Sequence, residues 1–108
     1  MEYSSNQGKA PAIIAYLTII GTIIAYFMNN DEKDPFASFH IRQALGIHIT
    51  FYLLGIVVSW FDSWFISAPF YLFIIVLWGY GLIAAIQGER NEVPILGRQF
   101  QNWFSTIN

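Results

Sequence analysis

Three long runs of uncharged, mostly apolar residues constrain this chain more than any other feature. They cover residues 12–28, 44–61 and 69–87. At about 1.5 Å per helical residue, each can cross most of the roughly 30 Å hydrocarbon core of a bilayer. Composition agrees, because 56% of the residues are hydrophobic and only 11% are charged, too few to cover a soluble domain of this size. We therefore predict an all-α integral membrane bundle of three transmembrane helices, with residues 1–108 as a single membrane domain.

The residues at the ends of the runs also favour helices. Pro11 precedes the first run at a position that suits the start of a helix, and Gly88 follows the third run where a C-cap is expected. Tyr16, Trp60 and Trp64 lie near run ends, where an amphipathic ring suits the headgroup region. A cleaved signal peptide is the alternative interpretation of the first run, but the run exceeds the usual apolar length of about 7 to 15 residues.

Two shorter segments are predicted to be amphipathic helices. Residues 36–43 repeat apolar side chains at helical spacing ahead of the second run, so the second helix should begin near the membrane surface. Residues 95–107 reach only about 20 Å as a helix, so this C-terminal segment should lie in the interface. Its expected apolar face consists of Ile95, Leu96, Phe100, Trp103, Phe104 and Ile107.

Lysine and arginine are distributed unevenly around the three expected spans. Lys9 precedes the first run, and the connection between the second and third runs has no Lys or Arg. The other four basic residues, Lys33, Arg42, Arg90 and Arg98, lie in the first connection and in the tail. Because basic residues mark cytoplasmic loops, this pattern predicts a cytoplasmic C-terminus and an N-terminus outside.

The composition excludes several kinds of function. The chain has no cysteine, which removes disulfides and thiolate chemistry, and its net charge of -2 without a basic run gives no basis for binding nucleic acid. No serine lies in a G-x-S-x-G turn and no paired carboxylates lie within the runs, so we predict that the protein is not an enzyme. His40 and His48 are too far apart along one helix to hold one metal ion. We therefore expect neither a metal nor a cofactor.

A few polar and small residues within the runs are candidates for interactions. His48 and Thr50 would lie at membrane depth, where His48 is expected to form a hydrogen bond between helices or, alternatively, a proton or ligand contact. Gly81 and Ala85 give the third helix a face of small residues. That face could pack against the first helix of the same chain or against a second copy.

The segment Phe39-His40-Ile41-Arg42-Gln43-Ala44, here called the FHIRQA segment, follows a polar turn and leads into a hydrophobic helix. Together with Gly88-Glu89 and the tail that Pro94 begins, it resembles a family of small prokaryotic multi-pass membrane proteins related to the Tic-twenty subunit of the chloroplast protein-import machinery. The resemblance implies a place in the prokaryotic cytoplasmic membrane. The positions it marks are Phe39, His40, Arg42, Gln43 and Ala44.

These features predict an accessory or scaffold subunit that acts through contacts with membrane lipids, a larger membrane complex or another copy of itself. Arg42 could bind a lipid phosphate, pair with a carboxylate such as Asp34 or Glu89, or donate to carbonyls at the end of a helix. One alternative is a small oligomeric channel or transporter, in which His48 and Thr50 line a path between subunits. Another, by analogy with the plastid relative alone, is a component of polypeptide transport.

Overall fold

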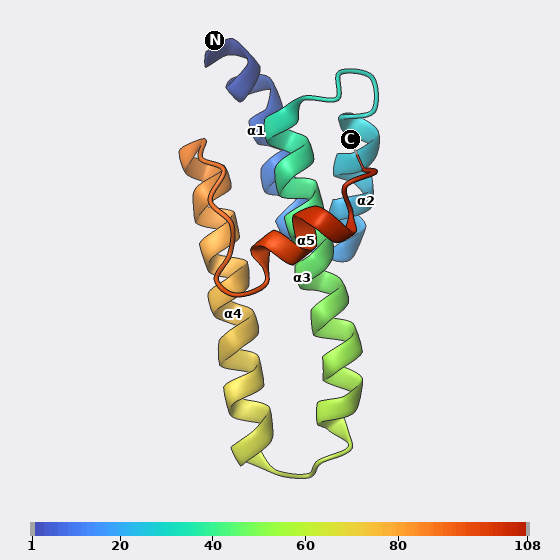
Figure 1. The fold of residues 1–108 in the computed structure, drawn as a ribbon, viewed down its shortest axis with the longest axis vertical. Helices are drawn as coiled ribbons and strands as arrows, with labels where there is room; N and C mark the ends of the chain where they lie inside the picture. Colours follow the sequence, from blue (N-terminus) through green and yellow to red (C-terminus); the bar gives the residue numbers. More distant parts are fainter. Residues whose placement is uncertain (1, 108) are drawn as a thin grey trace.

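A computed structural model describes residues 2–107 of the chain, with side chains described from Gly8 onward. That part of the chain consists of five α-helices without a strand, which confirms the all-α prediction (Figure 1). The helices are α1 (Glu2–Leu17), α2 (Ile19–Met28), α3 (Pro35–Ser59), α4 (Trp64–Gln87) and α5 (Gly97–Trp103).

The first apolar run is divided into two helices at Thr18, and α2 returns alongside α1 (Figure 1). Thr18 has an extended backbone, with φ -155° and ψ 173°, and its Oγ1 accepts a hydrogen bond from the Gly21 amide at 3.0 Å. This bond caps the first turn of α2. Gly21 allows the two helices to approach closely, since a Cβ at this position would lie 2.3 Å from the Ile14 carbonyl oxygen.

The prediction of three transmembrane helices is therefore wrong, because only α3 and α4 among the described helices are long and apolar enough to cross. The ten residues of α2 extend about 15 Å, roughly half of the hydrocarbon core. The α1–α2 pair is thus a helical hairpin, in which the chain turns back at Thr18 toward the end where α1 begins. The prediction of termini on opposite sides depended on a third crossing, whereas the fold brings the beginning of α1 and the end of α4 to one end (Figure 1).

The second and third apolar runs each form part of a longer helix. The amphipathic segment predicted at 36–43 continues into the second run, so that α3 is a single helix beginning at Pro35. Asp34 caps it, as its Oδ2 accepts a hydrogen bond from the Ala37 amide at 3.0 Å. Helix α4 begins earlier than the predicted run and includes Pro69. It ends at Gly88, which has the left-handed conformation expected of a C-cap, with φ 77°.

The C-terminal helix is shorter than predicted. Residues 88–96 return along α4, and α5 then crosses α3 (Figure 1). Ile95 has a positive φ of 70°, which is incompatible with a helix beginning at this residue. Phe100 is buried, and Leu96, Phe104 and Ile107 pack against the core, whereas Ile95 and Trp103 are exposed, so the apolar face predicted for residues 95–107 forms only in part.

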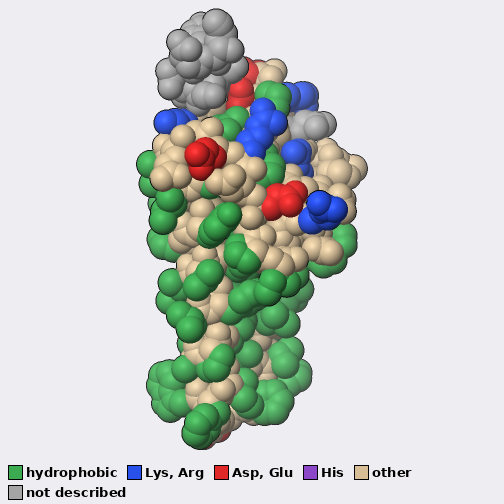
Figure 2. Space-filling model, turned by 60° about the vertical axis from the view of Figure 1, so that its left-hand side comes forward, with side chains coloured by type: hydrophobic (Ala, Val, Ile, Leu, Met, Phe, Trp, Pro, Cys, Tyr) green, Lys and Arg blue, Asp and Glu red, His purple; other side chains and the backbone are tan. Residues whose placement is uncertain are grey.

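The molecule has a broad end and a narrow end (Figure 2). Residues 51–73, the paired ends of α3 and α4 with their connection, form what we call the stem, and the other described residues form the head. All residues of the stem are described, and Phe70 alone among them is buried. The core lies in the head, where α1, α2 and α5 pack on the remaining parts of α3 and α4.

Candidate functional site

The FHIRQA segment lies on α3 at the centre of the head, where two of its polar side chains face a buried tyrosine of the hairpin. The Tyr16 hydroxyl lies 2.6 Å from His40 Nδ1, and Gln43 Nε2 donates to the same hydroxyl at 2.9 Å. His40 Nε2 lies 2.7 Å from the backbone carbonyl of Glu89. Tyr16, His40 and Gln43 are all fully buried. The network therefore joins α1, α3 and the segment that follows α4.

The geometry assigns the protons of this network. A backbone carbonyl can only accept, so His40 Nε2 carries a hydrogen and donates it to Glu89. The Tyr16 hydroxyl accepts from Gln43 and donates to His40 Nδ1. A protonated Nδ1 would leave the buried hydroxyl hydrogen of Tyr16 without that acceptor. The neutral form of His40 thus satisfies every group in the chain of bonds.

Gln43 also holds the segment that returns along α4. Its Oε1 accepts a hydrogen bond from the Val93 amide at 2.8 Å, and its Nε2 lies 3.3 Å from the Asn91 carbonyl. Val93 is buried at this point. One amide side chain thereby satisfies the backbone amide of Val93 and the carbonyl of Asn91, which is how a non-helical segment can pack against the helices.

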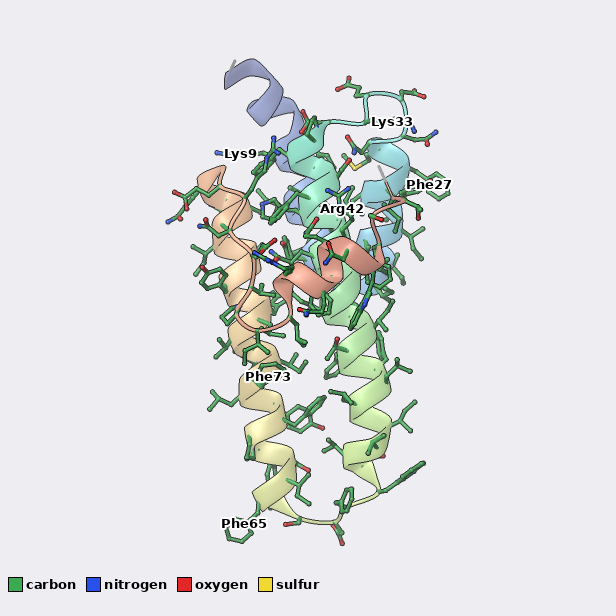
Figure 3. The ribbon with its side chains drawn as sticks, viewed as in Figure 1. Lys9, Phe27, Lys33, Arg42, Phe65 and Phe73 are labelled. Atoms are coloured by element: carbon green, nitrogen blue, oxygen red, sulfur yellow. The ribbon has the colours of Figure 1, made fainter. Side chains whose placement is uncertain are left out.

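Arg42 lies on another face of α3 and binds the end of the chain (Figure 3). Its Nε donates to Gln101 Oε1 at 2.7 Å, and its Nη1 donates to the Ile107 carbonyl at 2.7 Å. Gln101 Nε2 in turn donates to the Phe39 carbonyl at 2.9 Å. The partners of Arg42 are thus neutral groups of the C-terminal segment and not the carboxylates of Asp34 or Glu89.

The remaining marked positions support packing. Phe39 is buried with its ring edge-on to His40, at a centroid distance of 5.0 Å, and Ala44 is fully buried. Two residues beyond Ala44, Gly46 leaves room for Phe100 of α5, because a Cβ there would lie 2.3 Å from that ring. The FHIRQA segment consequently acts as a clamp that joins the hairpin on one side and the C-terminal segment on the other.

His48 lies on α3 one helical turn beyond Ala44, beside the turn of the hairpin. Its Nδ1 is 3.4 Å from Thr22 Oγ1, and that hydroxyl donates to the Ala15 carbonyl at 2.7 Å. Thr50 is half-buried on the same helix. His48 also borders a cavity of about 300 Å³, whose other walls include Leu17, Thr18, Phe51, Ile74 and Trp78.

Gly81 and Ala85 lie on the inner side of α4. A Cβ at Gly81 would be 2.6 Å from Cε1 of Tyr16, so the glycine allows the ring of α1 to pack directly on the backbone of α4. Trp78 Nε1 donates to the backbone carbonyl of Tyr16, and Ala85 is fully buried. The small residues thus accommodate the first helix of the same chain.

Three contributors to the head were missed by reasoning from the sequence. Tyr16 was expected in the headgroup region but is the central hydroxyl of the network. Thr22 and Asn29 were not singled out, although Asn29 Nδ2 donates to Ser38 Oγ at 3.0 Å and its Oδ1 accepts from the Asp34 amide at 2.9 Å. The available signal was the pair of threonines, Thr18 and Thr22, one turn apart within an otherwise apolar run.

The polar groups of the head are mutually satisfied. Among the described side chains, no buried nitrogen or oxygen lacks a hydrogen-bond partner. Within the same part of the chain, no group of three or more His, Asp or Glu residues could hold a metal ion together. The chemistry of the site is therefore that of a closed hydrogen-bond network.

Fold and site together define a small helical protein with two helices long and apolar enough to cross a membrane, a hairpin of two shorter helices and a clamped C-terminal segment. The chain belongs to the magnetosome magnetite crystal formation protein family, whose model matches residues 9–100 and so includes the whole FHIRQA segment. It is also 33% identical over 73 residues to a UPF0132 membrane protein of Methanocaldococcus jannaschii. That similarity covers 66% of this chain and 52% of the relative, so the chain spans about half the length of that protein. No solved structure matches the chain.

The family match corrects the resemblance drawn from the sequence. The FHIRQA segment, the Gly-Glu turn and the tail that Pro94 begins predict a relative of the Tic-twenty subunit, and that prediction is wrong. A short motif followed by a hydrophobic helix is too general a pattern to distinguish one family of small membrane proteins from another. The link to polypeptide transport, which depended on this resemblance, has no support.

Proposed function

We propose that the protein is a non-enzymatic accessory or scaffold subunit of a membrane, anchored by α3 and α4 and acting through the surface of its head. The observation that carries this proposal is that the polar side chains of the FHIRQA segment form hydrogen bonds within the protein. His40, Arg42 and Gln43 all bind other parts of the same chain. Residues committed to internal bonds are not available to transform a substrate. What remains accessible for function is the outer surface.

The outer surface of the head offers charges of both signs in two connections. Asp31, Glu32 and Lys33 are exposed before α3, and Glu89, Arg90 and Glu92 are exposed after α4. Mixed charges at a rim favour selective and reversible contacts with another protein. These two connections are the surface through which we propose that a partner is recognised.

The distribution of charge also supports an orientation for this scaffold. All five basic residues belong to the head, and three of them, Lys9, Lys33 and Arg42, are labelled there in Figure 3. The charged residue of the stem is Asp62, in the connection between α3 and α4. By the tendency of basic residues to remain in the cytoplasm, the head belongs on the cytoplasmic side of the membrane.

The only property that we transfer from the family to this chain is a membrane location. The family description concerns magnetite crystal formation, whereas the relative from Methanocaldococcus jannaschii is named for its membrane location alone. A scaffold role requires nothing more specific than that shared location. It leaves the partner to be identified by experiment.

Photo-crosslinking from single cysteines tests the proposal directly, because the natural chain has none. Glu32→Cys places a cysteine-reactive photo-crosslinker on the head, and Asp62→Cys places the same probe on the stem as a matched control. In native membranes we expect a discrete protein adduct from position 32 and none from position 62. Absence of any adduct at position 32, together with no phospholipid retained by the purified protein in mass spectrometry, would contradict a scaffold role.

The same two variants test the orientation. In intact cells, a membrane-impermeant maleimide should label Asp62→Cys and leave Glu32→Cys unlabelled until the membrane is opened. Labelling of Glu32→Cys in intact cells would reverse the proposed orientation. It would leave the crosslinking result, and hence the scaffold proposal, unaffected.

The cavity beside His48 supports a second candidate function, an oligomeric channel or transporter. The cavity lies at the turn of the hairpin, between the two crossing helices, and combines apolar walls with one imidazole. Two crossing helices cannot enclose a pore, so several copies would be needed. Ion or solute flux into liposomes that is lost in His48→Ala, with an unchanged melting temperature, would favour this candidate over the scaffold.

A further inference from the structure

The head and the stem have very different cross-sections. Four helices, α1 to α4, pass through the head, and α5 lies across it, whereas the stem consists of α3, α4 and their connection (Figures 1 and 2). Because α3 and α4 are long and apolar enough to cross a membrane, the head and the stem of a molecule anchored by them would lie toward opposite leaflets. The molecule is therefore a wedge with its broad end in one leaflet.

The broad end exposes apolar side chains of the kind that contact lipid. The side chains on the outer face of α2 are apolar and exposed, with Phe27 at 68% and Ile20 at 65% of full exposure. In α5, Trp103 is exposed beside the buried Phe100. An apolar hairpin that reaches only about half of the hydrocarbon core, flanked by an amphipathic helix, adds area to one leaflet alone.

We propose that the protein recognises membrane curvature, preferring a bilayer whose leaflet on the head side is convex. Convex bending spreads the headgroups and opens packing gaps that a shallow apolar element can fill, which is why binding by interfacial helices depends on curvature. The opposite leaflet is compressed by the same bending, and there the protein presents only its two-helix stem. Both ends of the wedge thus favour the same direction of curvature.

A reconstitution experiment can measure this preference. The full chain carrying Glu32→Cys is reconstituted into vesicles of mixed diameter, and a lipid dye in these vesicles reports the amount of membrane. A membrane-impermeant fluorescent maleimide then labels only molecules whose head faces outward. We expect the label per unit of membrane to rise about twofold from the largest to the smallest vesicles, which is a small part of the free-energy difference that a tenfold change would require. Asp62→Cys labels the molecules inserted the other way, and their density should fall over the same range. Densities independent of diameter for both labels would overturn the proposal.

Two matched sets of substitutions separate shape from hydrophobicity. Ile20→Ala, Ile24→Ala and Phe27→Ala together narrow the head, and Ile56→Ala, Leu72→Ala and Phe65→Ala together narrow the stem. All six side chains are exposed, so neither set touches the buried network. The head set should weaken the enrichment of outward-facing heads in small vesicles, and the stem set should strengthen it. If both sets changed the enrichment in small vesicles in the same direction, and both variants kept the melting temperature of the natural protein, the wedge would be refuted.

Discussion

The head and the stem both contain apolar parts of α3 and α4, yet they are held together in different ways. In the head, side chains of α1, α3 and the segment after α4 meet in hydrogen bonds of 2.6 to 2.9 Å around Tyr16, His40, Gln43 and Val93. In the stem, the rings of Phe51 on α3 and Phe70 on α4 stack with centroids 6.2 Å apart. The head therefore specifies the fold, and the stem serves as a membrane anchor that many apolar sequences could provide.

This difference has a physical origin. Within a bilayer, apolar side chains gain little by leaving lipid for one another, so close packing and polar bonds must supply the specificity of helix association. The head has both, because Gly81 and Gly46 admit rings against helix backbones and the FHIRQA segment supplies the bonds. Substitutions should consequently have large effects in the head and small effects in the stem.

The largest effect is expected for Gly81→Ala in the head. The new Cβ would lie 2.6 Å from the ring of Tyr16, and that ring cannot retreat, since its hydroxyl is bonded to His40 and Gln43. Overpacking of this kind costs about 3 kcal/mol of unfolding free energy. Gly79→Ala is the matched control, because nothing lies within 4 Å of a Cβ at that position. Melting in detergent should separate the two variants clearly, and equal melting temperatures would show that the Tyr16 contact is not a constraint.

A smaller loss is expected for Gln43→Leu, which keeps the volume but removes the amide. The buried Val93 amide would lose its acceptor and the Tyr16 hydroxyl would lose a donor. Leaving such groups unsatisfied costs about 2 kcal/mol. Gln99→Leu, at an exposed position on α5, provides the control. Denaturant unfolding of the three proteins measures the difference, and a Gln43→Leu protein as stable as the control would mean that the network does not determine the stability of the head.

Arg42→Ala should have a more local effect, of about 1 kcal/mol, because water can replace the guanidinium at the partly exposed Gln101 and Ile107. We expect faster hydrogen exchange in residues 97–107 and unchanged exchange in α4. Arg42→Lys should restore little of the protection, since one ammonium group cannot reproduce the two-point geometry of the guanidinium. Uniformly faster exchange throughout the molecule would instead show that Arg42 supports the whole head.

The accuracy of the prediction from sequence differs between the three apolar runs. Hydropathy identified the apolar part of α3 and of α4, because a helix that contacts lipid on most sides needs little beyond apolar side chains. The same criterion failed for residues 12–28, where Thr18 turns the chain back on itself. A threonine that caps a helix and one that is buried in a continuous span have the same hydropathy. The turn is decided by contacts such as that of Gly21 with Ile14, which no local window contains.

The sequence predicted which residues make up the candidate site but did not predict which other parts of the same chain they bind. The positions marked in the FHIRQA segment do converge on one region, yet their partners lie 24 to 65 residues away in sequence, from Tyr16 to Ile107. Helical spacing can show that His40 and Gln43 share a face of α3. It cannot show that this face is covered by the chain's own C-terminal segment, because Ile95 and Gly88 redirect that segment through backbone conformations with positive φ.

The smallest effect is expected in the stem, for Phe70→Leu. This substitution removes the stacked pair with Phe51 but leaves an apolar side chain of similar reach between α3 and α4. An aromatic pair contributes about 0.5 to 1.5 kcal/mol beyond the area it buries, and lipid chains can occupy part of the vacated space in a stem that is open on most sides. We therefore expect a loss below 1 kcal/mol, measured by the same denaturant unfolding as for Gln43→Leu. A loss equal to that of Gln43→Leu would mean that the two ends of the molecule contribute alike, and the stem would then be a specific helix pair, no longer a general anchor.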